Sequence, residues 1–248
     1  MKAQNDGTMD PETLRSFSRQ YYGHEIWLGD IIRDGDEIGV YGLYGHNMVP
    51  DYPMPSDYAN VILYDDDGRA EDPYREIVKK PHGWLFSFED KGADVYTLYV
   101  DSNSTWVTDE AGWHRGVKRD FSEVKYSGAF NMVAKRIISK DGKNPGSVVH
   151  SALELMPEVA VMTVGKDTKF RCLYEGNPMK GIKISCYMQD DEDMENTKTD
   201  DEGCFTYCPR KAGQAIIIAK YTDEGKNIDD EFDETSFKIT LTMEARDA

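Results

Sequence analysis

Two histidines early in the chain have the chemistry of metal ligands. His24 is followed 22 residues later by His46, and Met48 adds a thioether two residues after His46. Imidazole nitrogens suit nickel, cobalt and copper, and thioethers favour copper(I). The pattern therefore predicts a transition-metal site with His24 and His46 as the main ligands. Met48 and His114 are weaker candidates for the same site.

Each of these side chains also has a purely structural explanation. His24 could close the end of a strand and hydrogen-bond to a turn. His46 follows Gly45 in what reads as a loop that also contains Met48. His114 lies between Trp113 and an arginine, which is typical of a surface loop.

The four cysteines give little support for a zinc site or a disulfide. Cys204 and Cys208 bracket a short strand pattern, and four residues of strand would separate their sulfurs by about 13 Å. Cys172 and Cys186 could face each other across a hairpin. The lack of an export signal in the given sequence favours reduced thiols.

The sequence contains no recognisable motif for calcium binding or for catalysis. The acidic runs 190–193 and 229–234 lack the ligand spacing of a helix-loop-helix calcium site, so we interpret them as solvated loops. The sequence has no nucleophile elbow, phosphate-binding glycine loop or zinc-protease motif. We therefore expect a non-catalytic protein.

The charge balance limits the partners. The chain has 29 Lys and Arg against 46 Asp and Glu, a formal net charge of -17. This charge repels nucleic acid and anionic lipid and attracts cations or basic partners. The N-terminal residues are hydrophilic and no run is long and apolar enough to span a bilayer. The sequence as written predicts a cytoplasmic protein, or an extracytoplasmic one if an export signal is missing.

The candidate residues lie in a pattern of short strands separated by turns. One helix is predicted over 10–20, with Asp10 as its N-cap and a proline after it. The strands contain many β-branched and aromatic residues. In the first part of the chain they are predicted at 26–31, 37–44, 59–64, 83–88 and 95–100, with a long, bulged edge strand over 122–139 or a short helix as the alternative.

A linker over residues 140–147, rich in Gly, Lys and Asn, marks a domain boundary. Further strands are predicted at 153–156, 168–174, 182–188, 203–207, 215–221 and 236–243. The predicted fold is all-β, with two β-sandwich domains, immunoglobulin-like or jelly-roll-like, in tandem. The predicted organisation is an arm (1–21), a first sandwich (22–140), a linker (141–150) and a second sandwich (151–248).

The order of motifs resembles a known family. The segments 176–181, 199–203 and 211–213, with Phe205, resemble the immunoglobulin-like or transthyretin-like modules of extracellular bacterial proteins. Together with His24, His46 and the segment 106–113, they resemble the uncharacterised proteins associated with nickel and cobalt uptake, described as the periplasmic component of a transport system. The resemblance covers about residues 22–243.

The resemblance implies that the protein binds nickel or cobalt and passes it to or from a metal transporter or a metalloenzyme complex. In that family the first histidine follows a cleaved signal peptide, whereas here a hydrophilic arm precedes His24. A second hypothesis is an accessory subunit that docks on a larger complex through sandwich edges and an aromatic patch. The tryptophans all lie in the first predicted domain and could supply that patch.

Overall fold

The computed structural model describes residues 24–52, 59–79, 81–191 and 193–248. The helix predicted over 10–20 lies outside these residues. Within them every regular element is a β-strand except one 3-10 turn, η1 (Lys118–Asp120). The predicted all-β class is therefore confirmed.

The described strands form three sheets. The first has the order β1-β2-β7-β6, with β3 on β2. Its strands are β1 (Glu25–Asp34), β2 (Glu37–His46), β3 (Val49–Tyr52), β6 (Tyr74–Lys79) and β7 (His82–Glu89). A small sheet near the C-terminus has the order β11-β13-β14, with β17 on β13. Its strands are β11 (Leu153–Pro157), β13 (Thr168–Tyr174), β14 (Asn177–Pro178) and β17 (Cys204–Tyr207).

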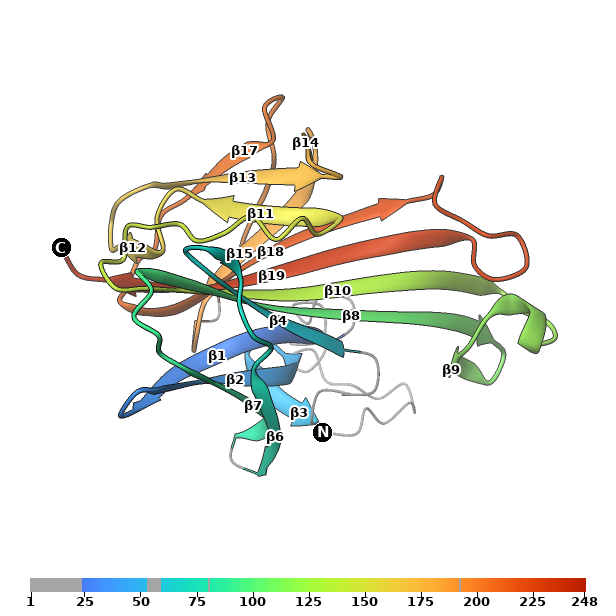
Figure 1. Cartoon of the computed structure of the whole chain (residues 1–248). Coiled ribbons are helices and arrows are strands. Elements are labelled where there is room, and N and C mark those ends of the chain that lie inside the picture. Colours follow the sequence, from blue (N-terminus) through green and yellow to red (C-terminus); the bar gives the residue numbers. More distant parts are fainter. Residues whose placement is uncertain (1–23, 53–58, 80, 192) are drawn as a thin grey trace.

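The third sheet has ten strands and lies between the other two. Its order is β16-β15-β18-β19-β10-β8-β4-β5, with β12 on β19 and β9 on β8. Its strands are β4 (Ala59–Asp65), β5 (Gly68–Arg69), β8 (Val95–Asp109), β9 (Gly112–Arg115), β10 (Tyr126–Ser139), β12 (Val161–Thr163), β15 (Lys183–Met188), β16 (Glu195–Lys198), β18 (Gly213–Asp223) and β19 (Glu234–Arg246). Figure 1 shows the first sheet below this central sheet and the small sheet above it.

The alternation of side chains along the central strands gives each face its own core. In β8, Val95 and Tyr99 pack in the cluster that includes the small sheet, whereas Leu98 and Val100 pack in the cluster under the first sheet. Successive side chains of a strand point to opposite faces, so one sheet can serve two sandwiches. The predicted sandwich packing is confirmed, with the central sheet common to both halves.

The parallel pairing of β10 with β19 connects the two halves. It runs from Gly128 opposite Glu234 to Arg136 opposite Thr242. β10 is thus an inner strand with β8 on its other side, and the predicted edge strand over 122–139 was wrong on this point. Residues 141–150 form no strand.

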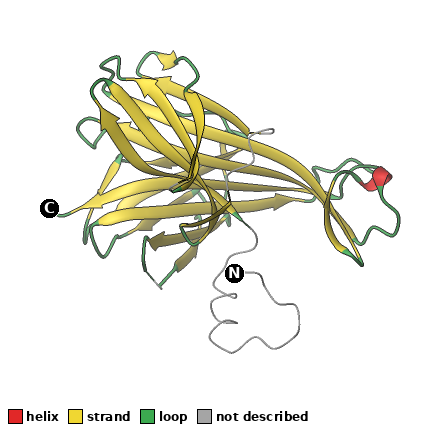
Figure 2. Ribbon diagram, turned by 90° about the horizontal axis from the view of Figure 1, so that it is seen from below, coloured by secondary structure: helices red, strands yellow, loops and turns green. Residues whose placement is uncertain are grey.

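The long strands β8, β10 and β19 extend beyond the layered region. Figure 2 shows their far ends leading to the short helical turn η1 at one tip of the molecule. There the acidic run 229–234 forms ion pairs with η1: Lys118 with Asp233 at 2.5 Å, and Arg119 with Glu231 at 2.7 Å. These pairs explain why the run is acidic. No helix among the described residues has the length and apolarity that crossing a membrane would require.

Candidate metal centre at the start of strand β1

A register shift in the first hairpin brings the two predicted histidines together. Near its turn the hairpin pairs Asp34 with Glu37, and a β-bulge between Leu28 and Ile31 moves the register by one residue. Beyond the bulge Glu25 lies opposite Gly45. Extending this antiparallel register by one residue places His24 opposite His46, on the same face of the pair.

The ring geometry agrees with this register. The ring centroids of His24 and His46 are 4.4 Å apart, with 43° between the ring planes. His24 also stacks on Tyr44, with centroids 4.4 Å apart and 9° between the planes. Both histidines are half-buried. The two imidazoles predicted as main ligands are therefore neighbours, held by a stacked tyrosine.

Met48 is not on the same side as the histidines. Asn47 and Met48 have φ values of 51° and 59° and form the turn between β2 and β3, as a two-residue hairpin loop requires. The Met48 side chain packs with Trp27 and Leu43. Trp27 and Leu43 are each three residues from a histidine along their own strand, so their side chains lie on the opposite face of the hairpin, and Met48 packs on that face. The predicted addition of Met48 to the site is not supported by this placement.

His114 is also placed elsewhere. It lies on β9, shares a hydrogen bond of 2.9 Å with Asp109 and stacks on Phe121 with ring centroids 5.5 Å apart. The bond with His114 lowers the pKa of Asp109. These contacts give His114 a structural role at the tip of the hairpin.

The register of the strands gives the distance between His114 and the pair formed by His24 and His46. Through β8, His114 aligns with Ser127 of β10, whereas Lys238, which contacts the His24 carbonyl, aligns with Met132. Five residues of strand separate these two positions of β10, roughly 17 Å. His114 therefore does not reach the pair formed by His24 and His46, and its predicted place in the site is corrected.

Sequence reasoning did not identify a buried ionic group next to the histidines. Glu25 is 1% exposed and accepts a hydrogen bond of 2.8 Å from the Tyr187 hydroxyl. Lys238 donates to the backbone carbonyl of His24 at 3.2 Å. Burial raises the pKa of Glu25, although Lys238 and Tyr187 oppose the shift. Burial also lowers the pKa of Lys238 to about 8, although Glu25 opposes it. The sequence did contain a signal for this group, because the carboxylate of Glu25 stands directly before the apolar residues Ile26, Trp27 and Leu28.

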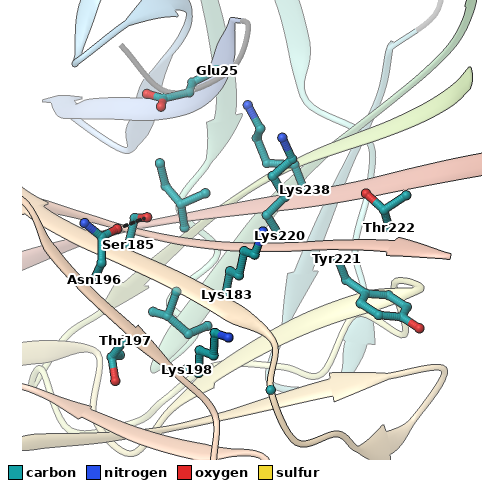
Figure 3. A pocket seen from close by; sticks show the side chains of 13 residues that line it. Glu25, Lys183, Ser185, Asn196, Thr197, Lys198, Lys220, Tyr221, Thr222 and Lys238 are labelled. Atoms are coloured by element: carbon teal, nitrogen blue, oxygen red, sulfur yellow. Dashed lines mark hydrogen bonds between the residues drawn. The ribbon is translucent and has the colours of Figure 1, made fainter. Parts of the chain in front are cut away.

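A groove of about 820 Å³ begins at this group and runs across the edge of the central sheet. Figure 3 shows Glu25 on one side of it, with lysine side chains from several strands extending into it. Glu25 points away from His24 because neighbouring residues of a strand face opposite sides. The histidine pair and the groove thus lie on opposite faces of β1.

The described residues contain no group of three or more His, Cys, Asp and Glu side chains that could hold a metal ion. The four cysteines are free thiols, and Cys172, Cys186 and Cys204 are buried. Burial raises the pKa of Cys172 to about 12. In the part of the chain that the structure describes, the histidine pair is therefore the best-formed candidate for a metal centre.

Comparison with known proteins gives a family and distant structural likenesses. The model of a family described as a domain of unknown function (DUF4198) matches residues 21–223. No curated protein matches. The fibronectin domains FN1–FN3 of chicken CNTN1 align at 11% identity and TM-score 0.21, covering 90% of this chain and 68% of that one. The N-terminal four Ig domains of Dscam1 isoform 1.9 align at 13% identity and TM-score 0.18, covering 88% and 42%. Alignments with identities and TM-scores as low as these establish neither the fold nor the function of this chain.

Proposed function

Because the chain belongs to the DUF4198 family, whose function is unknown, we propose a function from its own side chains: non-catalytic binding of a transition-metal ion by His24 and His46. The observation that carries the proposal is the 4.4 Å separation of the two imidazole rings. By the resemblance of its motifs, the metal is nickel or cobalt, taken up or delivered by the protein.

The donor set fits such an ion. Imidazole nitrogen is a good ligand for nickel, cobalt, copper and zinc, and affinity for a given site rises from cobalt through nickel to copper. Hard ions such as magnesium and calcium prefer oxygen ligands. The stacked ring of Tyr44 restricts the orientation of His24, which reduces the entropy lost when the metal binds.

The small number of ligands favours transfer of the metal over permanent storage. Two imidazoles leave coordination positions for water or for donors of a recipient protein. A metal transporter or a metalloenzyme complex could then take the ion by adding ligands one at a time. The acidic surface, with a net charge of -17, also attracts cations.

Equilibrium dialysis with nickel, cobalt, copper and zinc tests the proposal. The variant His24→Ala/His46→Ala is expected to bind the preferred metal at least about tenfold more weakly than the wild type. A matched control, His114→Gln/His150→Asn, also removes two imidazoles and should keep wild-type affinity. Asn is chosen at 150 because His150 has a φ of 57°, which Asn tolerates. Equal affinity of the wild type and the first variant would reject the site.

A second function, an accessory subunit that docks on a larger complex, is favoured by one edge of the first sheet. β6 is the end strand of that sheet and carries two exposed apolar side chains, Tyr74 at 68% and Ile77 at 63% exposure. An exposed edge strand can pair with a strand of another protein. Trp113, at 59% exposure, lies on β9 of the central sheet and does not belong to this edge.

Co-purification from the native source separates the two functions. If the edge docks, Ile77→Lys should remove a stoichiometric partner that the wild type retains, because a charge would be buried in the interface. Ile228→Lys, a change at a residue with 47% exposure outside the sheet edge, should retain it. Recovery of the same partner with Ile77→Lys would exclude β6 as the docking edge.

A further inference from the structure

Four lysines stand in register across four neighbouring strands. In the antiparallel ladders of the central sheet, Lys198 of β16 lies opposite Lys183 of β15, which lies opposite Lys220 of β18. Lys220 in turn lies opposite Lys238 of β19. Directly opposed residues point to the same face, so the four side chains form one row, the lysine row.

This arrangement is costly without a counter-ion. Like charges directly opposite each other destabilise a sheet, and the row repeats that contact three times. The rest of the chain carries an excess of acidic side chains that could have been placed opposite these lysines. Among the described residues, Lys183 and Lys198 form no ion pair with them.

Protection of a sheet edge explains only one member of the row. β16 is the end strand of the central sheet, and lysine on an edge strand discourages pairing with other chains. Lys220 and Lys238 lie on inner strands and are half-buried. Glu25 acts on Lys238 and Glu234 acts on Lys220 as opposite charges, so the inner half of the row is partly balanced and the outer half, Lys183 and Lys198, is open to a ligand.

The lysine row lines the groove described above. All four lysines border it, together with one carboxylate, Glu25. Its other polar walls are uncharged hydrogen-bonding side chains: Ser185, Asn196, Thr197 and Thr222. Figure 3 shows Lys183, Lys220 and Lys238 directed into the same space, with Ser185 and Asn196 hydrogen-bonded at one wall.

We propose that this groove binds a small linear oligoanion, a molecule with about three carboxylate or phosphate groups in a row. Four neighbouring strands span roughly 14 Å, since adjacent strands are about 4.8 Å apart. A ligand of that length can place a negative charge between successive ammonium groups. The hydroxyl and amide side chains of the walls can bond to its remaining oxygens.

The surrounding charge limits the size of the ligand. The whole chain has a net charge of -17, so a polyanion that extended beyond the groove would meet a repulsive surface. The same repulsion argues against nucleic acid. A short oligophosphate and a short acidic oligosaccharide share the required chemistry.

The groove and the histidine pair lie on opposite faces of β1. Glu25 faces the groove, whereas its neighbour His24 faces the other side of β1, beside His46. Oligoanion binding can be measured on metal-free protein, although the two sites are coupled: His46 lowers the pKa of Glu25, and Lys238 donates to the His24 carbonyl.

Isothermal titration calorimetry of the full chain, metal-free and at low salt, tests the proposal with two probes, sodium tripolyphosphate and the trimer of galacturonic acid. The preferred probe identifies the source of the anionic groups. The variant Lys183→Gln/Lys198→Gln is expected to lose roughly tenfold in affinity, because two exposed ion pairs are removed. Both positions are exposed, so the fold should be retained. Adding Lys220→Gln should weaken binding further.

The matched control is Lys166→Gln/Lys211→Gln, which changes the net charge equally at exposed positions outside the groove. It should bind as the wild type does. An equal loss of affinity in the control would show a general charge effect and overturn the proposal. So would the absence of binding to both probes at millimolar concentration.

Discussion

Replacing Glu154 by alanine is expected to lower the free energy of unfolding by about 3–5 kcal/mol, because it leaves a buried ammonium group without its counter-ion. Lys135 of β10 and Glu154 of β11 are 1% and 2% exposed, and their charged atoms are 2.6 Å apart. Without the carboxylate, Lys135 would retain the Leu155 carbonyl at 3.3 Å as its described partner.

The ion pair also connects the two halves of the molecule. β10 belongs to the central sheet and β11 to the small sheet above it, as Figure 1 shows. The backbone N–H of Ser151 donates to the other oxygen of Glu154 at 3.3 Å, so both oxygens are bonded. The loss of Glu154 therefore disrupts a fully bonded network in the core.

Urea denaturation followed by circular dichroism measures the effect. The double variant Lys135→Met/Glu154→Leu should recover most of the stability, because an apolar pair of similar volume avoids the desolvation of two charges. Asp201→Ala provides the control: it breaks the exposed pair of Lys180 and Asp201, whose charged atoms are 2.7 Å apart, and should cost less than about 1 kcal/mol. A similar small cost for Glu154→Ala would show that the buried pair is not needed.

Trp27→Ala is expected to cost about 3–5 kcal/mol, the usual range for removing a buried aromatic side chain. Trp27 is 1% exposed and packs with Leu43 of β2 and with Tyr187, Ile216 and Ile218. These last residues belong to β15 and β18 of the central sheet. Its indole thus holds the first sheet against the central one, next to both candidate sites.

Trp113→Ala is the matched control for this prediction. Trp113 is 59% exposed and touches only the edges of Tyr126 and Phe130 among the described rings, so its removal should cost less than about 1 kcal/mol. Urea melts of both variants, monitored by circular dichroism, give the comparison. Equal costs would mean that the contact between the two sheets does not depend on Trp27.

The sequence predicted most strands but not their full length. The strand at 168–174 was predicted with the bounds that β13 has. The strand at 95–100 continues to Asp109, through the polar run 101–105, which shows no apolar alternation. Backbone pairing with β10 extends it. β16 was not predicted, because all four of its side chains are exposed and leave no pattern.

The sequence predicted only part of the candidate metal site, because it did not specify which side chains share a face of the hairpin. Side-chain chemistry identified His24 and His46, but a thioether two residues after His46 also suggested Met48, which packs on the other face of the hairpin. The β-bulge between Leu28 and Ile31 decides the pairing. Without it the register would differ by one residue and His24 would face Asn47, since a slip of one residue exchanges the two faces of a strand.

That this protein is built from strands can be read from its residues, because alternation and turn residues are local properties. The tertiary structure decided which strands became neighbours. The pairing of β10 with β19, the contact of Glu25 with Tyr187 and the lysine row all join residues from distant parts of the chain. Alternation assigns a side chain to one face of a sheet, but it does not specify the strand that will lie beside it.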